Sequence, residues 1–244
     1  MPPAGTPHPD PRRRHVRRAL TVLSLAALTA VGGCASGEAT FPGAEEESSA
    51  AGAGVTCEDP PAPPADVPSF TQADLPAPLP AEPATLTATL ETTCGDVVLE
   101  LDAAAAPQTV ASFEFLAGEG YWDDSPCHRL TTQGIFVLQC GDPTGSGRGN
   151  PGYGYGIENA PADGVYPPGT LAMARAQDPE SNGGQFFIVY EETRLPVEGG
   201  GYSIFGRVTE GLEIVEAIAA EGVEGAGGDG APAQPVSIRS VDVG

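Results

Sequence analysis

Over residues 86–91 leucine or alanine alternates with threonine or glutamate. This period of two predicts a β-strand that buries one face. Gly95-Asp96 then predicts a turn into a return strand over residues 97–101. The folded domain is therefore expected over residues 85–244.

Two segments have apolar residues at the spacing of an amphipathic helix. The first, residues 107–117, begins with a proline and is followed by a glycine, which suits the two ends of a helix. In the second, residues 211–220, one stripe contains Leu212, Val215 and Ala219. We expect two α-helices at these places.

Further short apolar segments lie between glycine-rich turns and predict strands. They fall around residues 127–131, 135–140, 170–174, 185–190, 203–208 and 236–241. Many short strands with only two helices predict a mainly β protein. The expected architecture is a closed or nearly closed β-barrel with a helix at each end.

The start of the chain is typical of an export signal. Five arginines precede an apolar run of about 13 residues, Ala19 to Val31, which is too short to span a bilayer. Gly32-Gly33-Cys34 follows and resembles a bacterial lipobox, in which the cysteine is lipidated. We expect a signal peptide over residues 1–33, lipidation of Cys34 and anchoring at the outer face of the cell membrane. An ordinary signal and a secreted protein are the alternative.

Residues 34–84 predict a tether rather than a domain. They are dense in alanine, glycine, glutamate and serine, and in proline after Cys57. Such a composition buries too little apolar area to offset the entropy of ordering. We expect a disordered linker that spaces the domain from the membrane.

The charge of the chain excludes several classes of function. The formal net charge is −22, and no lysine is present. This charge repels phosphate backbones, so we expect no nucleic-acid partner. The absence of lysine excludes P-loop and Schiff-base chemistry. His128 is the only histidine after the signal, which excludes a histidine-based zinc site, and no serine lies in a Gly-x-Ser-x-Gly setting for a triad.

Several motifs in the domain resemble those of the cyclophilin-type peptidyl-prolyl cis-trans isomerases. They are Cys127-His128-Arg129, Ile135 to Asp142, Gly169 to Arg175, Ser181 to Phe187, and Ile204 to Val208. The resemblance covers about residues 85–243. It implies a closed eight-stranded antiparallel β-barrel capped by two α-helices. It also implies an isomerase of X–Pro bonds that acts on proline-containing peptides and unfolded exported proteins, as a monomer and without a metal or other cofactor.

The resemblance also implies which residues form the site. Arg129 matches the catalytic arginine, and Gln139 the glutamine beside it. Phe136 and Phe187 match the aromatic walls of a proline pocket. The implied substrate-binding residues are Phe136, Val137, Ala174, Arg175, Ala176, Gln185, Phe187, Leu195 and Tyr202. Arg175, Leu195 and Tyr202 stand where many members have asparagine, tryptophan and histidine.

An arginine suits this chemistry because it stays protonated and its planar fork is rigid. Rotation about an X–Pro bond must break amide resonance, and the proline nitrogen regains its lone pair at the twisted transition state. A guanidinium that donates to this nitrogen favours the twisted form. The alternative is a catalytically weak module, tethered to the cell surface, that binds proline peptides without turning them over.

Four cysteines besides Cys34 allow three disulfide pairings in an exported protein. We favour Cys57–Cys94, which would pin the linker to the domain, and Cys127–Cys140, which brackets a predicted hairpin around Gln133-Gly134. The second pair conflicts with simple alternation. If Arg129 and Gln139 share a face of the hairpin, Cys127 and Cys140 fall on opposite faces unless a bulge intervenes.

Overall fold

The structure is a computed structural model that describes residues 54–80 and 82–244. The expected signal peptide and the lipidation of Cys34 lie outside these residues. Within the described part, no helix has both the length and the apolar character needed to cross a membrane.

The elements follow the predicted order closely. The helices of the described residues are the 3₁₀-helix η1 (Gln72–Asp74) and the α-helices α1 (Pro107–Gly118) and α2 (Leu212–Ala220). The strands are β1 (Thr85–Thr92), β2 (Gly95–Asp102), β3 (Ser125–Pro126), β4 (Arg129–Gln133), β5 (Ile135–Cys140), β6 (Val165–Tyr166), β7 (Thr170–Met173), β8 (Phe186–Val189), β9 (Thr193–Arg194), β10 (Ile204–Glu210), β11 (Asp229–Gly230) and β12 (Ser237–Val243).

Ten strands form one antiparallel sheet in the order β11-β4-β5-β8-β7-β10-β2-β1-β12-β3, and β6 pairs with β9 in a separate ribbon. The sheet is strongly curled, because β3 lies at one edge and β4 next to the other, yet only Cys127 and His128 join them. No ladder joins the two edges within the described residues. The mainly β architecture with two helices is confirmed, but the barrel is open rather than closed.

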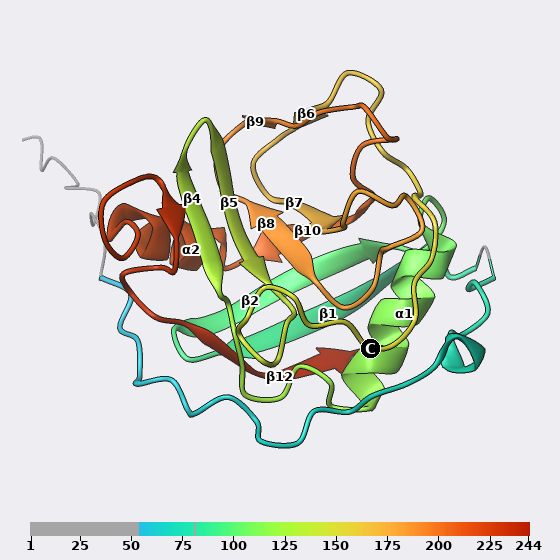
Figure 1. Ribbon diagram of the computed structural model, residues 1–244, viewed down its shortest axis with the longest axis horizontal. Helices are drawn as coiled ribbons and strands as arrows, with labels where there is room; N and C mark the ends of the chain where they lie inside the picture. Colours follow the sequence, from blue (N-terminus) through green and yellow to red (C-terminus); the bar gives the residue numbers. More distant parts are fainter. Residues whose placement is uncertain (1–53, 81) are drawn as a thin grey trace, which may run out of the picture. The chain divides into compact units, whose positions relative to one another are not determined.

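The core lies inside the curl. Alternate residues of β1 and β2, including Leu90, Leu99 and Leu101, are at most 2% exposed. They face an aromatic cluster in which Phe113 of α1 contacts Trp122 at 4.6 Å between ring centroids. Figure 1 shows α1 and α2 at opposite ends of the curled sheet, and both helices contribute to this core.

Helix α1 receives its N-terminal cap from a distant loop. Ala106 precedes the helix and has no side chain that could cap it. Instead the Glu158 carboxylate accepts hydrogen bonds from the backbone N–H groups of Gln108 and Thr109, at 3.0 and 2.8 Å. A carboxylate at this end satisfies unpaired N–H donors and complements the helix dipole.

The linker prediction is wrong for residues 54–80, which we call the N-terminal arm. The arm runs along the domain past β12 to α1 (Figure 1). The Phe70 ring packs edge-on against Phe115, with centroids 5.0 Å apart. The Phe70 N–H donates to the Pro151 carbonyl at 2.7 Å. Apolar side chains of the arm therefore cover the domain, although its composition resembles that of a tether.

Both favoured disulfides are present, Cys57–Cys94 and Cys127–Cys140. The conflict over the second pair is resolved without the expected bulge. Strand β4 begins only at Arg129, so Cys127 precedes the ladder and does not follow its alternation. Its N–H donates instead to the Val236 carbonyl of the neighbouring chain segment. Cys127 and Cys140 both lie in the core.

Candidate active site

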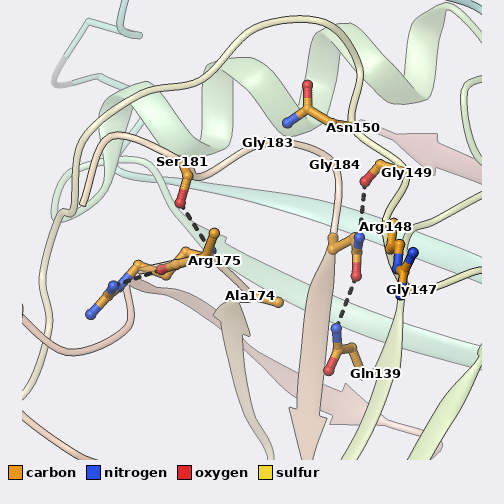
Figure 2. Close-up of a pocket in the computed structure, with 12 residues that line it drawn as sticks. Gln139, Gly147, Arg148, Gly149, Asn150, Ala174, Arg175, Ser181, Gly183 and Gly184 are labelled. Carbon is orange, nitrogen blue, oxygen red and sulfur yellow. Dashed lines mark hydrogen bonds between the residues drawn. The ribbon is translucent and has the colours of Figure 1, made fainter. Parts of the chain in front are cut away.

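Two adjoining cavities open on one side of the sheet. The first, which we call the Arg129 cavity, has a volume of about 220 Å³. It is lined by Arg129, Ile135, Val137, Gln139, Ala174, Arg175, Phe187, Leu195 and Tyr202. The second, the Arg148 cavity, has a volume of about 410 Å³ and shares Gln139, Ala174 and Arg175 with the first. Figure 2 shows the Arg148 cavity.

The floor of the Arg129 cavity is apolar. Val137 of β5 lies opposite Val189 of β8, and Phe187 of β8 lies opposite Gln139 of β5. Val137 and Phe187 are 3% and 4% exposed. The Phe187 ring meets Tyr202 edge-on, at 5.9 Å between centroids. A surface of this kind fits a small apolar ring and excludes water from it.

The Arg129 guanidinium lies at the edge of this floor and is held on two sides. Its Nε and Nη2 atoms each donate to one carboxylate oxygen of Asp229, both at 2.7 Å. Its Nη1 atom donates to Gln139 Oε1 at 3.1 Å. The hydrogen bond to Asp229 raises the pKa of Arg129 above its ordinary value. The group therefore stays protonated, and N–H donors of Nη1 and Nη2 remain for a ligand.

Two glutamines continue this hydrogen-bonded chain into the Arg148 cavity. Gln139 Nε2 donates to Gln185 Oε1 at 2.9 Å, and Gln185 Nε2 donates to the Gly149 carbonyl at 2.9 Å. Because every amide has a partner, the orientation of each side chain is fixed. The polar sides of the two cavities are thus one connected network. Figure 2 shows its section between Gln139 and Gly149.

Asp142 anchors the loop that ends this network. Its buried carboxylate accepts hydrogen bonds from the N–H groups of Thr144, Arg148 and Gly149, at 2.9–3.0 Å. The hydroxyls of Thr144 and Ser146 donate to it as well. Burial alone raises the pKa of Asp142, but these hydrogen bonds outweigh burial and lower it to about 2.

Arg175 separates the two cavities. Its guanidinium donates to the carbonyls of Gly201, Ala176 and Gly199, at 2.7, 2.9 and 3.1 Å. It also lies over the Tyr202 ring, with Cζ 5.0 Å from the centroid. The resemblance implied that Arg175 belongs to the substrate-binding residues. The structure shows a side chain that also fixes the glycine-rich loop over residues 199–201.

The cavities hold no cluster of metal-ligating side chains. Over residues 54–80 and 82–244, no group of three or more histidine, cysteine, aspartate or glutamate residues has a suitable arrangement. His128 is close to the Arg129 cavity in sequence but is not among its lining residues. Burial lowers the pKa of His128 below its ordinary value, so its neutral form is favoured.

A family model described as "Cyclophilin type peptidyl-prolyl cis-trans isomerase/CLD" matches residues 87–243. The chain belongs to this family. A "Probable peptidyl-prolyl cis-trans isomerase B" of Mycobacterium leprae is 41% identical over 177 residues, covering 67% of this chain and 58% of that protein. The protein of the same name in Mycobacterium tuberculosis is 38% identical over 208 residues, covering 77% and 64%. The chain thus spans about three fifths of the length of these two relatives.

Solved cyclophilin structures share the fold. The chain resembles a Cryptosporidium parvum cyclophilin-type isomerase with a TM-score of 0.56 and 28% identity, covering 66% of this chain and 98% of that one. A second structure of the same protein, described as in the presence of the dipeptide Ala-Pro, gives a TM-score of 0.55, also at 28% identity.

Most residues assigned from the cyclophilin resemblance line a cavity. The Arg129 cavity contains Arg129, Val137, Gln139, Ala174, Arg175, Phe187, Leu195 and Tyr202, and the Arg148 cavity contains Ala176 and Gln185. Phe136 is the exception and lines neither cavity. Its ring packs against Tyr190, 6.0 Å away between centroids.

The correction for Phe136 follows from strand geometry. Successive side chains of a strand point to opposite faces. Val137 and Gln139 line the Arg129 cavity, so Ile135 belongs to the same face and Phe136 to the other. Alternation along residues 135–139 was available in the sequence and identifies Ile135 as the lining residue.

Asp229 is another residue that the sequence analysis missed, as it missed Arg148 of the second cavity. Asp229 lies in the glycine-rich segment before the last strand, 100 residues after Arg129. Strand β11 brings it to the site by pairing Asp229 with Thr131 and Gly230 with Leu130 of β4. Nothing in the local sequence distinguishes this aspartate from the many other acidic residues of the chain.

Proposed function

We propose that this cyclophilin is an active peptidyl-prolyl cis-trans isomerase that takes proline into the Arg129 cavity. The observation that carries the proposal is the Arg129 guanidinium, held by Asp229 and Gln139 at the edge of an apolar floor. The Ala-Pro dipeptide named with a similar structure supports proline peptides as the ligand class.

The geometry suits the isomerisation step. The barrier to rotation about a peptide bond is about 18–20 kcal/mol because planarity is lost. At the twisted state the proline nitrogen carries a lone pair, which an N–H of Arg129 stabilises more than it stabilises the planar amide. No covalent bond forms or breaks, and no proton is transferred.

Arg129 alone is insufficient for a large acceleration. A 10⁴-fold rate gain needs about 5.5 kcal/mol, whereas one charge-assisted hydrogen bond contributes about 1.5–3 kcal/mol. Desolvation of the proline ring on Val137 and Phe187 strengthens the hydrogen bond. Gln139 and Gln185 orient the peptide backbone and so reduce the entropy lost in reaching the transition state.

The test uses the full-length protein and a short Ala-Pro peptide whose isomerisation is followed by NMR exchange, without a protease. We expect Arg129→Ala to lower kcat/KM about 10²–10³-fold, the loss typical of one transition-state donor. Arg129→Lys should restore little, since an ammonium lacks the planar fork. Arg207→Ala, which removes an exposed arginine paired with Glu100, is the matched control.

The same experiment separates the enzyme from a module that only binds. A binding module shows no turnover in the parent protein, and Arg129→Ala then mainly raises the Kd for the peptide. An unchanged rate in Arg129→Ala would overturn the proposed mechanism.

We further propose that the protein acts on exported, unfolded proteins from a lipid anchor at Cys34. The arginine-rich start, the short apolar run and Gly33-Cys34 support export and lipidation. Two acyl chains on Cys34 would hold the domain stably at the membrane. Fractionation tests this: Cys34→Ala should leave the membrane fraction, and a variant that stays there contradicts the proposal.

A further inference from the structure

We propose that Arg148 binds a carboxylate side chain of the substrate, with Arg175 adding positive charge nearby, so that the enzyme prefers proline peptides with an aspartate or glutamate near the proline. This inference rests on the proposed isomerase function. It concerns the Arg148 cavity, which adjoins the Arg129 cavity through Gln139, Ala174 and Arg175. A proline bound in the first cavity places a nearby residue of the same peptide at the second.

The charge at the two cavities is opposite to that of the molecule. The chain has 33 acidic residues and a net charge of −22. Not one acidic residue lines either cavity, whereas three of the arginines do. The positive charge of Arg129 is balanced by the Asp229 carboxylate, with which it forms a bidentate ion pair. The net positive charge at the cavities therefore comes from Arg148 and Arg175.

These two arginines differ from the others of the domain in their partners. Arg129, Arg194, Arg207 and Arg239 each form an ion pair with an acidic residue. In the part of the chain that the structure describes, neither Arg148 nor Arg175 forms one. Among the arginines of residues 54–80 and 82–244, only Arg148 and Arg175 are left without a carboxylate partner, an arrangement suited to receive a carboxylate from a ligand.

Both arginines are presented from fixed backbone. The Arg148 N–H donates to the buried Asp142 carboxylate at 3.0 Å, while the residue itself is exposed. Arg175 is held by three backbone carbonyls and by the Tyr202 ring. Figure 2 shows Arg175 and Ser181 on one side of the cavity and Arg148 on the other, with the Arg175 guanidinium directed away from Arg148. Preorganised donors lose less entropy on binding than mobile ones.

Three acidic residues lie near this charge without lining the cavity. The Asp142 carboxylate is taken up by the N–H groups of its own loop, those of Thr144, Arg148 and Gly149. Asp178 and Glu180 lie on the loop that carries Ser181, but neither lines the cavity. The Asp178 carboxylate accepts the Glu180 N–H at 3.0 Å, and the Glu180 carboxylate lies beside Gly156. Repulsion from more distant acids is weakened at physiological ionic strength, where the Debye length is about 8 Å.

The experiment compares aspartate with asparagine, which has nearly the same shape but no charge. A set of hexapeptides with one proline carries Asp, Asn or Lys at each of the positions flanking the proline, and NMR exchange gives kcat/KM for the full-length protein. At one position we expect Asp to exceed Asn about 3- to 10-fold, as ion pairs near a surface allow, and Lys to fall below Asn. Raising the NaCl concentration from 50 to 500 mM should shrink this ratio.

Variants assign the preference to the cavity. Arg148→Gln should bring the Asp/Asn ratio close to one, and Arg148→Glu should invert it in favour of Lys. Arg207→Gln makes the same change of net charge outside both cavities and should leave the ratio as in the parent protein. An Asp/Asn ratio of one at every position in the parent, or a preference that survives in Arg148→Glu, would overturn the inference.

The outcome is distinguishable from failure of the proposed function. If no peptide is turned over, the isomerase proposal fails. Titration of the same peptides into the protein, followed by NMR, then gives the Kd values for the Asp/Asn comparison. A preference for Asp in Kd that Arg148→Glu reverses would still support the carboxylate site. Turnover of all peptides at equal rates would leave the isomerase proposal intact and reject the carboxylate site.

Discussion

Ile135 and Phe136 are sequence neighbours on β5 with opposite roles. Ile135 lines the Arg129 cavity, whereas Phe136 packs against Tyr190. We expect Ile135→Ala to raise KM for an Ala-Pro peptide several-fold, because truncating a half-buried aliphatic contact costs about 1 kcal/mol. Phe136→Ala should change KM less, although it lowers stability. Steady-state measurement of both variants checks this, and a larger KM effect for Phe136→Ala would restore the assignment from the family.

Asp229 acts through Arg129 rather than on the substrate. It accepts hydrogen bonds from two of the guanidinium nitrogens at 2.7 Å. Without these bonds the Arg129 guanidinium can rotate away from its position at the edge of the cavity. We expect Asp229→Asn to lower kcat about 10-fold with little change in KM, since small misplacements of a catalytic group cost up to about 100-fold. Asp229→Glu should recover part of kcat because it restores the carboxylate.

The control for Asp229 lies in the same loop. Glu224→Gln makes the same change of charge at an exposed residue that does not contact Arg129. Normal kcat in Asp229→Asn would show that Gln139 alone is enough to position the arginine.

At the scale of elements, the N-terminal arm belongs to the folded domain. Cys57–Cys94 fixes one end of it, and Phe70 packs among Phe115, Tyr121 and Tyr153. We expect Phe70→Ala to lower the free energy of unfolding by about 1–3 kcal/mol, as for other partly buried aromatic residues. Denaturant titration measures this. Val197→Ala, at an apolar residue 45% exposed, should stay within about 0.5 kcal/mol of the parent.

The loop after β5 is stabilised by a group that titrates in acid. The pKa of Asp142 is lowered to about 2 in the folded protein, from its ordinary value of 3.8. The ionised carboxylate therefore stabilises the fold above about pH 4, and this contribution, about 2 kcal/mol, is lost as the pH falls from 4 to 2. Asp142→Asn should be less stable at pH 7 and should lose less stability over that interval. Unfolding curves at several pH values test this, and parallel pH profiles for the two proteins would contradict it.

For the molecule as a whole, activity and acid stability depend on different groups. Arg129 does not titrate near neutrality, and its pKa is raised further by Asp229. We therefore expect kcat/KM to be flat from pH 6 to 8. The pKa of His128 is lowered by burial, so this residue stays neutral in the folded protein at pH 7 and adds no inflection above its usual value. A pH–rate profile with a step between pH 6 and 8 would implicate a titrating group outside this mechanism.

The sequence by itself determined the longer helices and strands and indicated the family. Period-two alternation located β1 and β2, helical spacing located α1 and α2, and the ordered motifs from Arg129 to Phe187 indicated the family. These features are local, because the spacing of apolar residues within one strand or helix indicates which of its faces is buried. The alternation along residues 135–139 also predicts that Ile135, and not Phe136, lines the cavity. The assignment to Phe136 came from the family motif instead.

Only the tertiary structure decided the contacts between distant segments. Asp229 reaches Arg129 across 100 residues because β11 pairs with β4, and no local pattern marks one acidic residue among 33. The N-terminal arm is held on the domain because Phe70 packs on a surface formed by Phe115 of α1 and Tyr153 of a distant loop. The open sheet depends on where the chain leaves the ladder at Cys127. Each is a property of surfaces that form only when the chain is folded, so composition and periodicity could not reveal it.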